Sequence, residues 1–276
     1  MLCIEMGLPA PNGKNAGKAD DLLDQVDVPA TVVCARCGSV DCPGCELDET
    51  LSGVIAFVAW ERRDAPFFRR LWMTARATTR DPDSFFEALP DGPITPALSF
   101  ALTSEILAAS AMIFALLPVV AIISPLWAKE LLTNSASRAL AIRALVVGIP
   151  ILAAMLVMAH AAHGLALDAG ARRSGARPER KRALRFGLYA TGWDLVLGPL
   201  GALVVALTEG LSAAAALGKQ GMKLPGTSAR AFLRGAYHLY DESANGAMRV
   251  AYLTAALFSV LVALAVLGFL VALAFA

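Results

Sequence analysis

Charge is scarce in this 276-residue chain. Only 17% of its residues are Asp, Glu, Lys or Arg, against roughly 25% in an ordinary soluble domain. Hydrophobic residues make up 57% of the chain and the mean hydropathy is +0.60. This composition excludes a typical soluble domain and indicates a membrane protein with several spans. The net charge of +1 gives no electrostatic argument for binding nucleic acid.

Catalytic and targeting motifs are also missing. The sequence contains no phosphate-binding loop, nucleophile triad or dinucleotide fingerprint, so we expect no enzymatic activity. The segment from Met1 to Pro11 lacks a basic stretch followed by an apolar one. We therefore expect no cleavable signal peptide.

The longest uncharged run is Val250 to Ala276. An α-helix rises about 1.5 Å per residue, so roughly 20 apolar residues cross the hydrocarbon core of a bilayer. Similar runs recur after Pro96. They predict an all-α membrane protein whose domain at residues 96–276 is a bundle of five transmembrane helices, at about 97–123, 139–165, 183–197, 200–218 and 250–275.

The segments ahead of the bundle differ from it in composition. Residues 1–31 are rich in Pro, Gly and Asn, which predicts a disordered tail. Residues 49–95 form a cytoplasmic or interfacial segment with a basic amphipathic helix that ends before Asp81-Pro82. Two alternatives stay open for this helix: it lies flat in the headgroup layer, or its apolar face packs on the spans. Its apolar face is Phe67, Phe68, Leu71, Trp72 and Ala75, and its basic residues are Arg69, Arg70, Arg76 and Arg80.

Four of the five cysteines lie together, within residues 32–48. Cys34, Cys37, Cys42 and Cys45 form two C-x-x-C turns separated by four residues. Four thiolates close a tetrahedral zinc site with no open position, so the spacing favours a small zinc knuckle with structural Zn²⁺. Iron, or no metal at all, are the alternatives. A catalytic metal is not expected, because no His or carboxylate completes an open coordination sphere.

Lys and Arg are distributed unequally between the flanks of the spans. Six Arg lie between Glu61 and Arg80 and seven basic residues between Asp168 and Arg185, whereas the connection from Ser124 to Arg138 has only Lys129 and Arg138. Because basic flanks stay in the cytoplasm, five spans predict a multi-pass protein of the cell inner membrane with a cytoplasmic N-terminus and an external C-terminus. The cysteines then lie where thiols stay reduced.

A few ionisable residues fall within the predicted spans, where such groups are candidates for function. We expect His160 to contact Glu105 or Glu209, and Arg143 to pair with Asp194 at the opposite side of the membrane. Three interpretations are open: hydrogen bonding between helices, a proton or ion path through Glu105, His160 and Glu209, or half of a metal site at His160 and His163. For the metal site, no carboxylate at helical spacing completes the pair of histidines.

The order of several short motifs resembles that of the bacterial Yip-type family, relatives of the Ypt/Rab-interacting membrane proteins. The motifs lie between Trp60 and Leu211, and two features depart from the family: the cysteine segment, and a long insert before the last span. The motifs are Trp60-Glu61-Arg62, Leu71-Trp72-Met73-Thr74, Asp81-Pro82-Asp83-Ser84-Phe85-Phe86, Arg185-Phe186-Gly187-Leu188-Tyr189-Ala190, Pro199-Leu200-Gly201 and Gly210-Leu211.

The resemblance implies five helices, a cytoplasmic N-terminus, no enzymatic chemistry and a role in shaping or sorting membranes. We therefore expect an integral membrane scaffold or adaptor whose zinc knuckle docks a cytoplasmic protein. The alternative is a transporter or channel for ions or small solutes that uses Glu105, Glu209 and His160. The expected partners are the lipid bilayer, a cytoplasmic protein and a second copy of the chain, with no nucleic acid.

Overall fold

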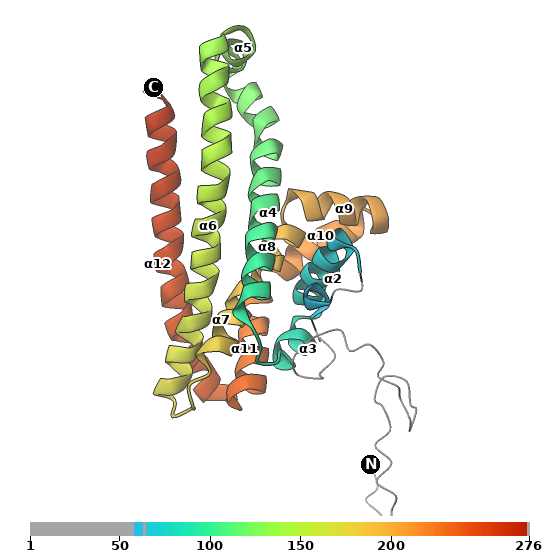
Figure 1. Ribbon diagram of the computed structural model, residues 1–276, viewed down its shortest axis with the longest axis vertical. Helices are drawn as coiled ribbons and strands as arrows, with labels where there is room; N and C mark the ends of the chain where they lie inside the picture. The colour runs from blue at the N-terminus through green and yellow to red at the C-terminus, as the bar shows by residue number, and fades with distance from the viewer. Residues whose placement is uncertain (1–57, 63–64, 275–276) are drawn as a thin grey trace, which may run out of the picture. The chain divides into compact units, whose positions relative to one another are not determined.

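Three long apolar helices form the axis of the part of the chain that the structure describes. In the computed structural model, which describes residues 58–62 and 65–274, these helices are α4 (Ile94–Ile123), α6 (Ser135–Arg173) and α12 (Asp241–Ala274). Helix α6 packs against both α4 and α12. The axes of the three helices are nearly parallel in Figure 1, and α6 runs in the direction opposite to α4 and α12. Each is long enough and apolar enough to cross a membrane.

The described residues form helices joined by short connections and contain no strands, which confirms the predicted all-α class. Two prolines lie inside the long helices, Pro118 in α4 and Pro150 in α6, as membrane helices tolerate. The remaining elements are η1 (Ala59–Glu61), α2 (Phe67–Arg80), α3 (Pro82–Glu87), α5 (Pro125–Thr133), α7 (Arg180–Ala190), α8 (Gly192–Leu197), α9 (Pro199–Glu209), α10 (Leu211–Gly221) and α11 (Leu224–Tyr237).

Short helices surround one end of the axis and form a helical head. Helices α2, α7 and α8 pack against the first half of α4, and α3 packs against α11. The first half of α4 is therefore buried on one face, including Phe100, whereas its second half exposes apolar side chains such as Phe114 and Ile122. The core of the head is aromatic: Phe85, Phe86, Phe100, Phe186, Tyr189, Trp193 and Phe232 are all buried.

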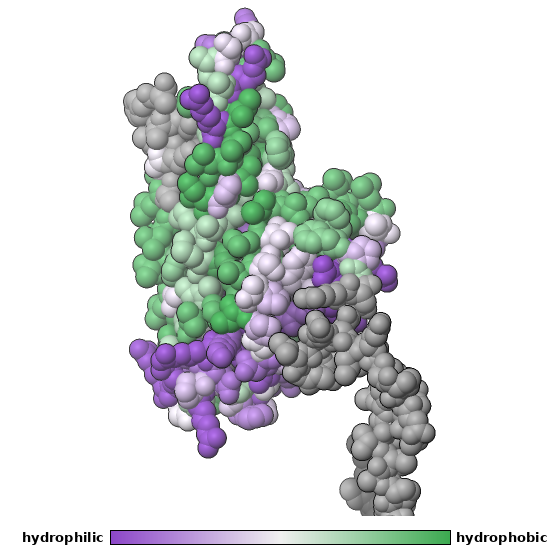
Figure 2. All heavy atoms as spheres, viewed as in Figure 1, coloured by the Kyte–Doolittle hydropathy of each residue, from purple (hydrophilic) through white to green (hydrophobic). Residues whose placement is uncertain are grey.

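Hydrophobic and hydrophilic side chains lie in separate bands on the surface, in agreement with the exposed apolar half of α4. Figure 2 shows a hydrophobic belt over the long helices between a broad hydrophilic region at the head end and a small one at the α5 end. Exposed basic residues at the head end include Arg172, Arg173 and Arg180, and Lys129 and Arg138 lie in or next to α5. Such a belt is typical of a protein that crosses a bilayer.

The structure does not confirm the predicted third and fourth spans as two separate spans. Residues 183–197 fall in α7 and α8, which continue into α9 after a bend of 61° at Gly198. Three helices could therefore cross a membrane, or four if the bent pair counts as one span. The predicted third span has 15 residues, about 22 Å of helix, which is shorter than a hydrocarbon core of about 30 Å.

The basic amphipathic helix is confirmed as α2. It ends at Arg80, immediately before Asp81-Pro82, as the sequence predicted. Leu71 and Ala75 of its apolar face are buried in the head, but Phe68 is 73% exposed. Packing on the protein thus accounts for the inner part of the face, and the exposed phenylalanine stays available for contact with lipid.

Candidate functional site

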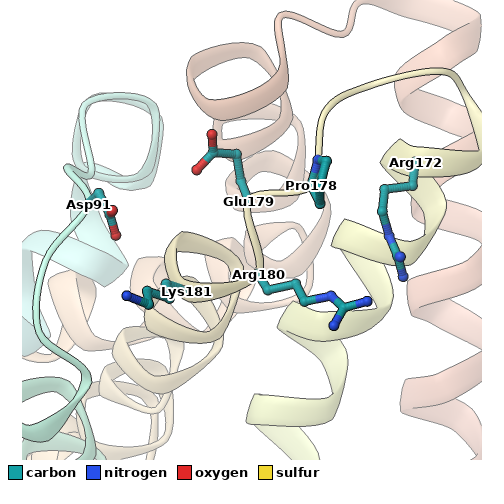
Figure 3. Close-up of a pocket in the computed structure, with 6 residues that line it drawn as sticks. All are labelled: Asp91, Arg172, Pro178, Glu179, Arg180 and Lys181. Atoms are coloured by element: carbon teal, nitrogen blue, oxygen red, sulfur yellow. The ribbon is translucent and has the colours of Figure 1, made fainter.

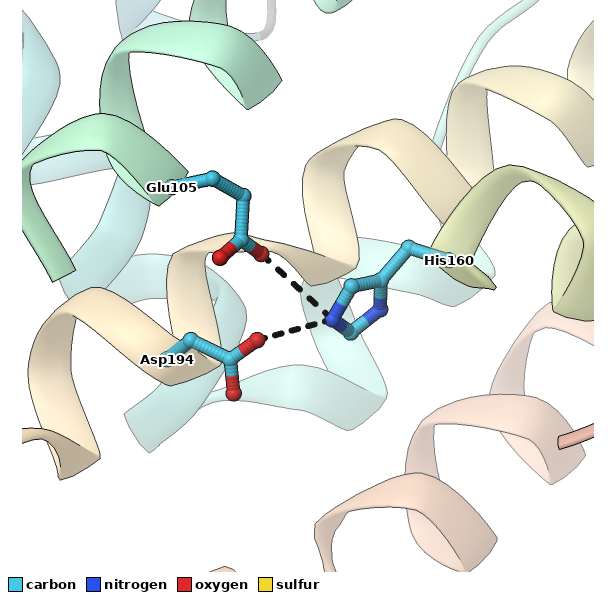
Figure 4. A group of neighbouring side chains, drawn as sticks. All are labelled: Glu105, His160 and Asp194. Carbon is cyan, nitrogen blue, oxygen red and sulfur yellow. Dashed lines mark hydrogen bonds and ion pairs between the residues drawn. The ribbon is translucent and has the colours of Figure 1, made fainter. Parts of the chain in front are cut away.

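Three ionisable side chains meet where the helical head joins the long helices. Glu105 comes from α4, His160 from α6 and Asp194 from α8, and all three point toward one another in Figure 4. The Nε2 atom of His160 lies 2.9 Å from Oδ2 of Asp194 and 3.6 Å from Oε1 of Glu105. One nitrogen and two carboxylate oxygens lie within 4.8 Å of one another. We call these three residues the EHD cluster.

Close packing of α7 on α6 fixes the backbone beside His160. A Cβ atom on Gly187 would lie 2.2 Å from the carbonyl oxygen of His160, and one on Gly164 would lie 2.2 Å from the carbonyl oxygen of Ala183. Only glycine at these two positions allows the helices to approach so closely. The ring of Trp193 then meets the imidazole edge-on, with 5.9 Å between the ring centroids.

The helix break before α8 brings Asp194 to the cluster. Helix α7 ends at Ala190 and α8 begins at Gly192, whose missing side chain leaves room for the backbone of Ala75. A Cβ atom on Gly192 would also lie 2.5 Å from the hydroxyl oxygen of Thr78. Helix α8 can therefore lie directly on α2 while its other side carries Asp194 toward α4 and α6.

Burial differs sharply within the EHD cluster. The side chain of Glu105 is 0% exposed, that of His160 17% and that of Asp194 42%. Neither carboxylate oxygen of Glu105 has a hydrogen-bond partner among the described residues. A buried carboxylate without hydrogen bonds is costly unless a positive charge or a proton compensates it. Glu105 is therefore the member of the cluster whose carboxylate most requires a compensating proton or positive charge.

The structure tests three predicted contacts of the ionisable residues. The expected contact between Glu105 and His160 is confirmed. Glu209 is not part of it: its carboxylate pairs with Arg80 at 2.6 Å and Arg76 at 3.6 Å. Of the three residues of the predicted ion path, the structure thus brings Glu105 and His160 together and pairs Glu209 with arginines of α2.

The predicted pair of Arg143 and Asp194 is wrong. Asp194 contacts His160, and positions 143 and 160 of α6 lie about 25 Å apart along the helix axis. The prediction assumed that the segment before Leu197 crosses the whole membrane, whereas α8 ends partway along α6. His163 also stays outside the cluster, with Nδ1 3.4 Å from the carbonyl oxygen of Ala251.

A second polar group lies at the head end, where α6 meets α11. Tyr237 donates a hydrogen bond to Asp168, which also accepts one from the backbone nitrogen of Glu179 and pairs with Arg172. Burial, and then the hydrogen bond to Asp168, raises the pKa of Tyr237 well above its usual value of 10.0. This network ties the connection between α6 and α7 to α11.

A shallow cavity of about 400 Å³ opens beside this network (Figure 3). Arg172, Arg180 and Lys181 contribute positive charge to its wall, and Asp91 and Glu179 contribute negative charge. Because the two signs nearly balance, the cavity lacks the concentrated positive charge that would select a phosphate.

The four cysteines of the predicted zinc knuckle, Cys34, Cys37, Cys42 and Cys45, lie outside the described residues, as does the predicted disordered tail. Comparison of the chain with protein-family models, with curated proteins and with solved structures gives no match.

Proposed function

We propose that this protein is an integral membrane scaffold that organises or bends the bilayer by placing a hydrophobic hairpin in one leaflet. The hairpin consists of α9 and α10, joined at Gly210, and we call it the lateral arm. The observation that carries the proposal is the direction of the arm. Helix α9 lies beside α4 in Figure 1, partway along the long helices, and extends sideways away from them.

The lateral arm exposes large apolar side chains. Leu203 is 56% exposed, Leu207 78% and Leu211 81%. Leu203 and Leu207 are four residues apart in α9 and lie on one face of it. Figure 2 shows the arm as a hydrophobic extension of the belt over the long helices. Exposed apolar surface that continues the lipid-facing belt favours contact with lipid.

Polar contacts border the arm near α2. Arg76 and Arg80 of α2 pair with Glu209 at the end of α9, and Phe68 of α2 is exposed. Charged groups beside apolar ones are typical of helices that lie at the boundary between headgroups and acyl chains. A body inserted at that boundary expands one leaflet more than the other, and an integral anchor holds it at a constant depth.

The backbone conformation of Gly210 allows the chain to reverse between α9 and α10. Its φ is 94°, in the region that favours glycine, and a Cβ atom there would meet nothing within 4 Å. The backbone conformation, rather than crowding, therefore requires glycine at this turn. Helix α10 then returns toward α8, and Gly221 at its end lies against the side chain of Leu197.

The orientation in the membrane is part of the proposal. The basic head end is cytoplasmic and the α5 end is external, since Lys and Arg accumulate on the cytoplasmic side of short flanks. The zinc knuckle at Cys34, Cys37, Cys42 and Cys45 then lies in the cytoplasm, where it docks a protein partner. The Yip-type resemblance supports the same function, because that family implies shaping or sorting of membranes.

Reconstitution into liposomes tests the scaffold. The double variant L203Q/L207Q removes apolar contact from the arm, and L126Q/L132Q makes the same change in α5, where both leucines are about 80% exposed. We expect the wild type and the α5 variant to produce smaller or tubular vesicles in electron micrographs, and the arm variant to lose this effect.

Equal vesicle shapes for the wild type, both variants and protein-free liposomes would contradict the proposal. The depth of the arm is measured separately in the variant L207W, through quenching of its fluorescence by lipids brominated at different positions. We expect the strongest additional quenching near the headgroup end of the acyl chains. Maximal quenching at the bilayer centre would instead favour the bent pair as a fourth span.

A further inference from the structure

We propose that Glu105, His160 and Asp194 form a binding site for a divalent transition-metal cation such as Zn²⁺. The proposal goes beyond the scaffold function and does not depend on it. It rests on the convergence of three ligand types from three helices on one point, and on the unsatisfied, fully buried carboxylate of Glu105.

The distances within the EHD cluster suit coordination. Zinc binds imidazole nitrogen and carboxylate oxygen at about 2.0–2.2 Å, which for tetrahedral angles places ligand atoms about 3.4 Å from one another. The observed separations from His160 Nε2 are 2.9 Å to Asp194 and 3.6 Å to Glu105. Small side-chain rotations would therefore place all three atoms around one ion without moving a helix.

The charges of the cluster also favour a divalent ion. When the imidazole is neutral and both carboxylates are ionised, Glu105 and Asp194 supply two negative charges in a largely apolar part of the molecule. One divalent cation balances both of them and provides the partner that the oxygens of Glu105 lack. A monovalent cation would leave a net negative charge, which is costly away from water.

The type of ligand selects among divalent cations. An imidazole nitrogen suits zinc, iron and nickel, whereas magnesium and calcium prefer sites made of oxygen alone. Three protein ligands leave a fourth position for water or a small anion. Asp194, with 42% of its side chain exposed, lies at the accessible side of the cluster, and Glu105 closes the opposite side. An ion would thus enter past Asp194.

Metal binding would fasten the lateral arm to the long helices. Asp194 lies four residues before Gly198, where the chain turns into α9. A bound ion would hold α8 against α4 and α6, whereas in its absence only the contact with His160 joins the carboxylate of Asp194 to α6. A bound ion would therefore fix the base of the arm to α4 and α6.

The test measures Zn²⁺ binding to the full chain purified in detergent. The four clustered cysteines are replaced by serine so that they do not compete, in C34S/C37S/C42S/C45S. Titration against a chromophoric chelator gives the affinity and the number of ions per chain. We expect one Zn²⁺ per chain, and a loss of affinity of at least about tenfold in E105Q and in H160Q, because even ligand-orienting groups are worth about 10- to 100-fold.

Matched controls separate the site from general effects. H163Q removes the neighbouring buried histidine, and E209Q removes a carboxylate that pairs with Arg80 instead. Both are expected to keep the affinity of the parent. D194N, at the most exposed of the three ligands, gives a third variant should E105Q or H160Q fail to fold.

Two outcomes would overturn the metal site: no Zn²⁺ binding by the chain without the four clustered cysteines, or equal affinity in D194N and the parent. Mg²⁺ at the same concentration is expected not to displace Zn²⁺. Displacement would contradict the inference that the imidazole of His160 makes the site prefer Zn²⁺ to Mg²⁺. Because vesicle shape is measured independently, loss of metal binding leaves the scaffold function standing, and unchanged vesicle shapes leave the metal site standing.

Discussion

Arg185 in α7 is ion-paired with Glu61 in η1, 124 residues earlier in the chain, with 2.5 Å between Nη2 and Oε1. The side chain of Arg185 is 1% exposed, and that of Glu61 is 14% exposed. Tyr189, one turn further along α7, donates a hydrogen bond to the same carboxylate oxygen. The pair thus joins the first described element of the chain to the helix that packs beside the EHD cluster.

The first prediction concerns this pair. Glu61→Ala leaves the buried guanidinium of Arg185 without a counter-charge, and removal of one partner from a buried pair costs about 3–5 kcal/mol. We expect a clear fall in the thermal unfolding midpoint of the protein in detergent, measured by tryptophan fluorescence. Asp83→Ala serves as the control, because Asp83 pairs with Arg234 at 3.4 Å on the surface, where ion pairs contribute little.

Equal midpoints for Glu61→Ala and the wild type would show that the pair does not hold η1 in the head. A fall of the same size in Asp83→Ala would instead show that the protein is sensitive to any loss of a carboxylate near α2 and α3.

Local patterns explain what the sequence could predict. Helix α2 follows from its apolar spacing and from Asp81-Pro82 at its end, and α4, α6 and α12 follow from hydrophobic runs longer than a bilayer requires. These signals need no knowledge of packing. Where the sequence predicts two further spans, the structure has α7–α8 and the lateral arm. This arrangement depends on the packing of α8 on α2 in the head, and no local sequence pattern indicates that contact.

The EHD cluster was predicted only in part for the same reason. Glu105 and His160 were matched by depth in two predicted spans that are single long apolar helices in the structure, and they are in contact. Asp194 was given the wrong depth because its segment was taken as a full span. The Gly192 and Gly198-Pro199 breaks around it were the available signal, since glycine and proline so close together mark an interrupted helix.

A second prediction tests how packing positions the cluster. Gly187→Ala would place a Cβ atom 2.2 Å from the carbonyl oxygen of His160 and push α7 away from α6. Overpacking of this kind costs about 1–3 kcal/mol. We expect a lower unfolding midpoint and weaker Zn²⁺ binding, although Gly187 contributes no ligand atom.

The matched control is Gly246→Ala in α12, where a Cβ atom would meet nothing within 4 Å. Alanine stabilises a helix interior by about 1 kcal/mol relative to glycine, so this variant should unfold at the wild-type temperature or above it. Wild-type metal affinity in Gly187→Ala would show that the contact between α6 and α7 does not position His160.

A third prediction concerns high pH. The pKa of Tyr237 is raised by burial and by its hydrogen bond to Asp168, so the folded protein holds this proton more tightly than the unfolded chain does. The contribution to stability is complete below pH 10 and is lost as the pH rises further, by about 1.4 kcal/mol per unit. The free energy of unfolding should therefore fall more steeply above pH 10 in the wild type than in Tyr237→Phe.

Tyr240→Phe is the control for this comparison, because Tyr240 is 56% exposed. Its unfolding profile should follow that of the wild type throughout. Parallel profiles for the wild type and Tyr237→Phe would mean that Tyr237 does not remain protonated in the folded state.

A fourth prediction distinguishes the lateral arm from two complete spans. Five spans would place the turn at Gly198–Gly201 in water outside the cell, whereas the bend into α9 keeps Leu200 partway along α6. We expect a membrane-impermeant thiol reagent to label Ser137→Cys in intact cells, and to label Ser174→Cys only after the membrane is permeabilised. Leu200→Cys should remain unlabelled in intact cells.

The unsubstituted protein sets the background, because its five cysteines all precede residue 46 and the proposed orientation places them in the cytoplasm. Strong labelling of Leu200→Cys in intact cells would restore the predicted third and fourth spans and remove the arm from the proposed function. Labelling of Ser174→Cys in intact cells would reverse the orientation instead, because this residue lies at the basic head end, directly after α6. The two substitutions therefore test the number of crossings and their direction separately.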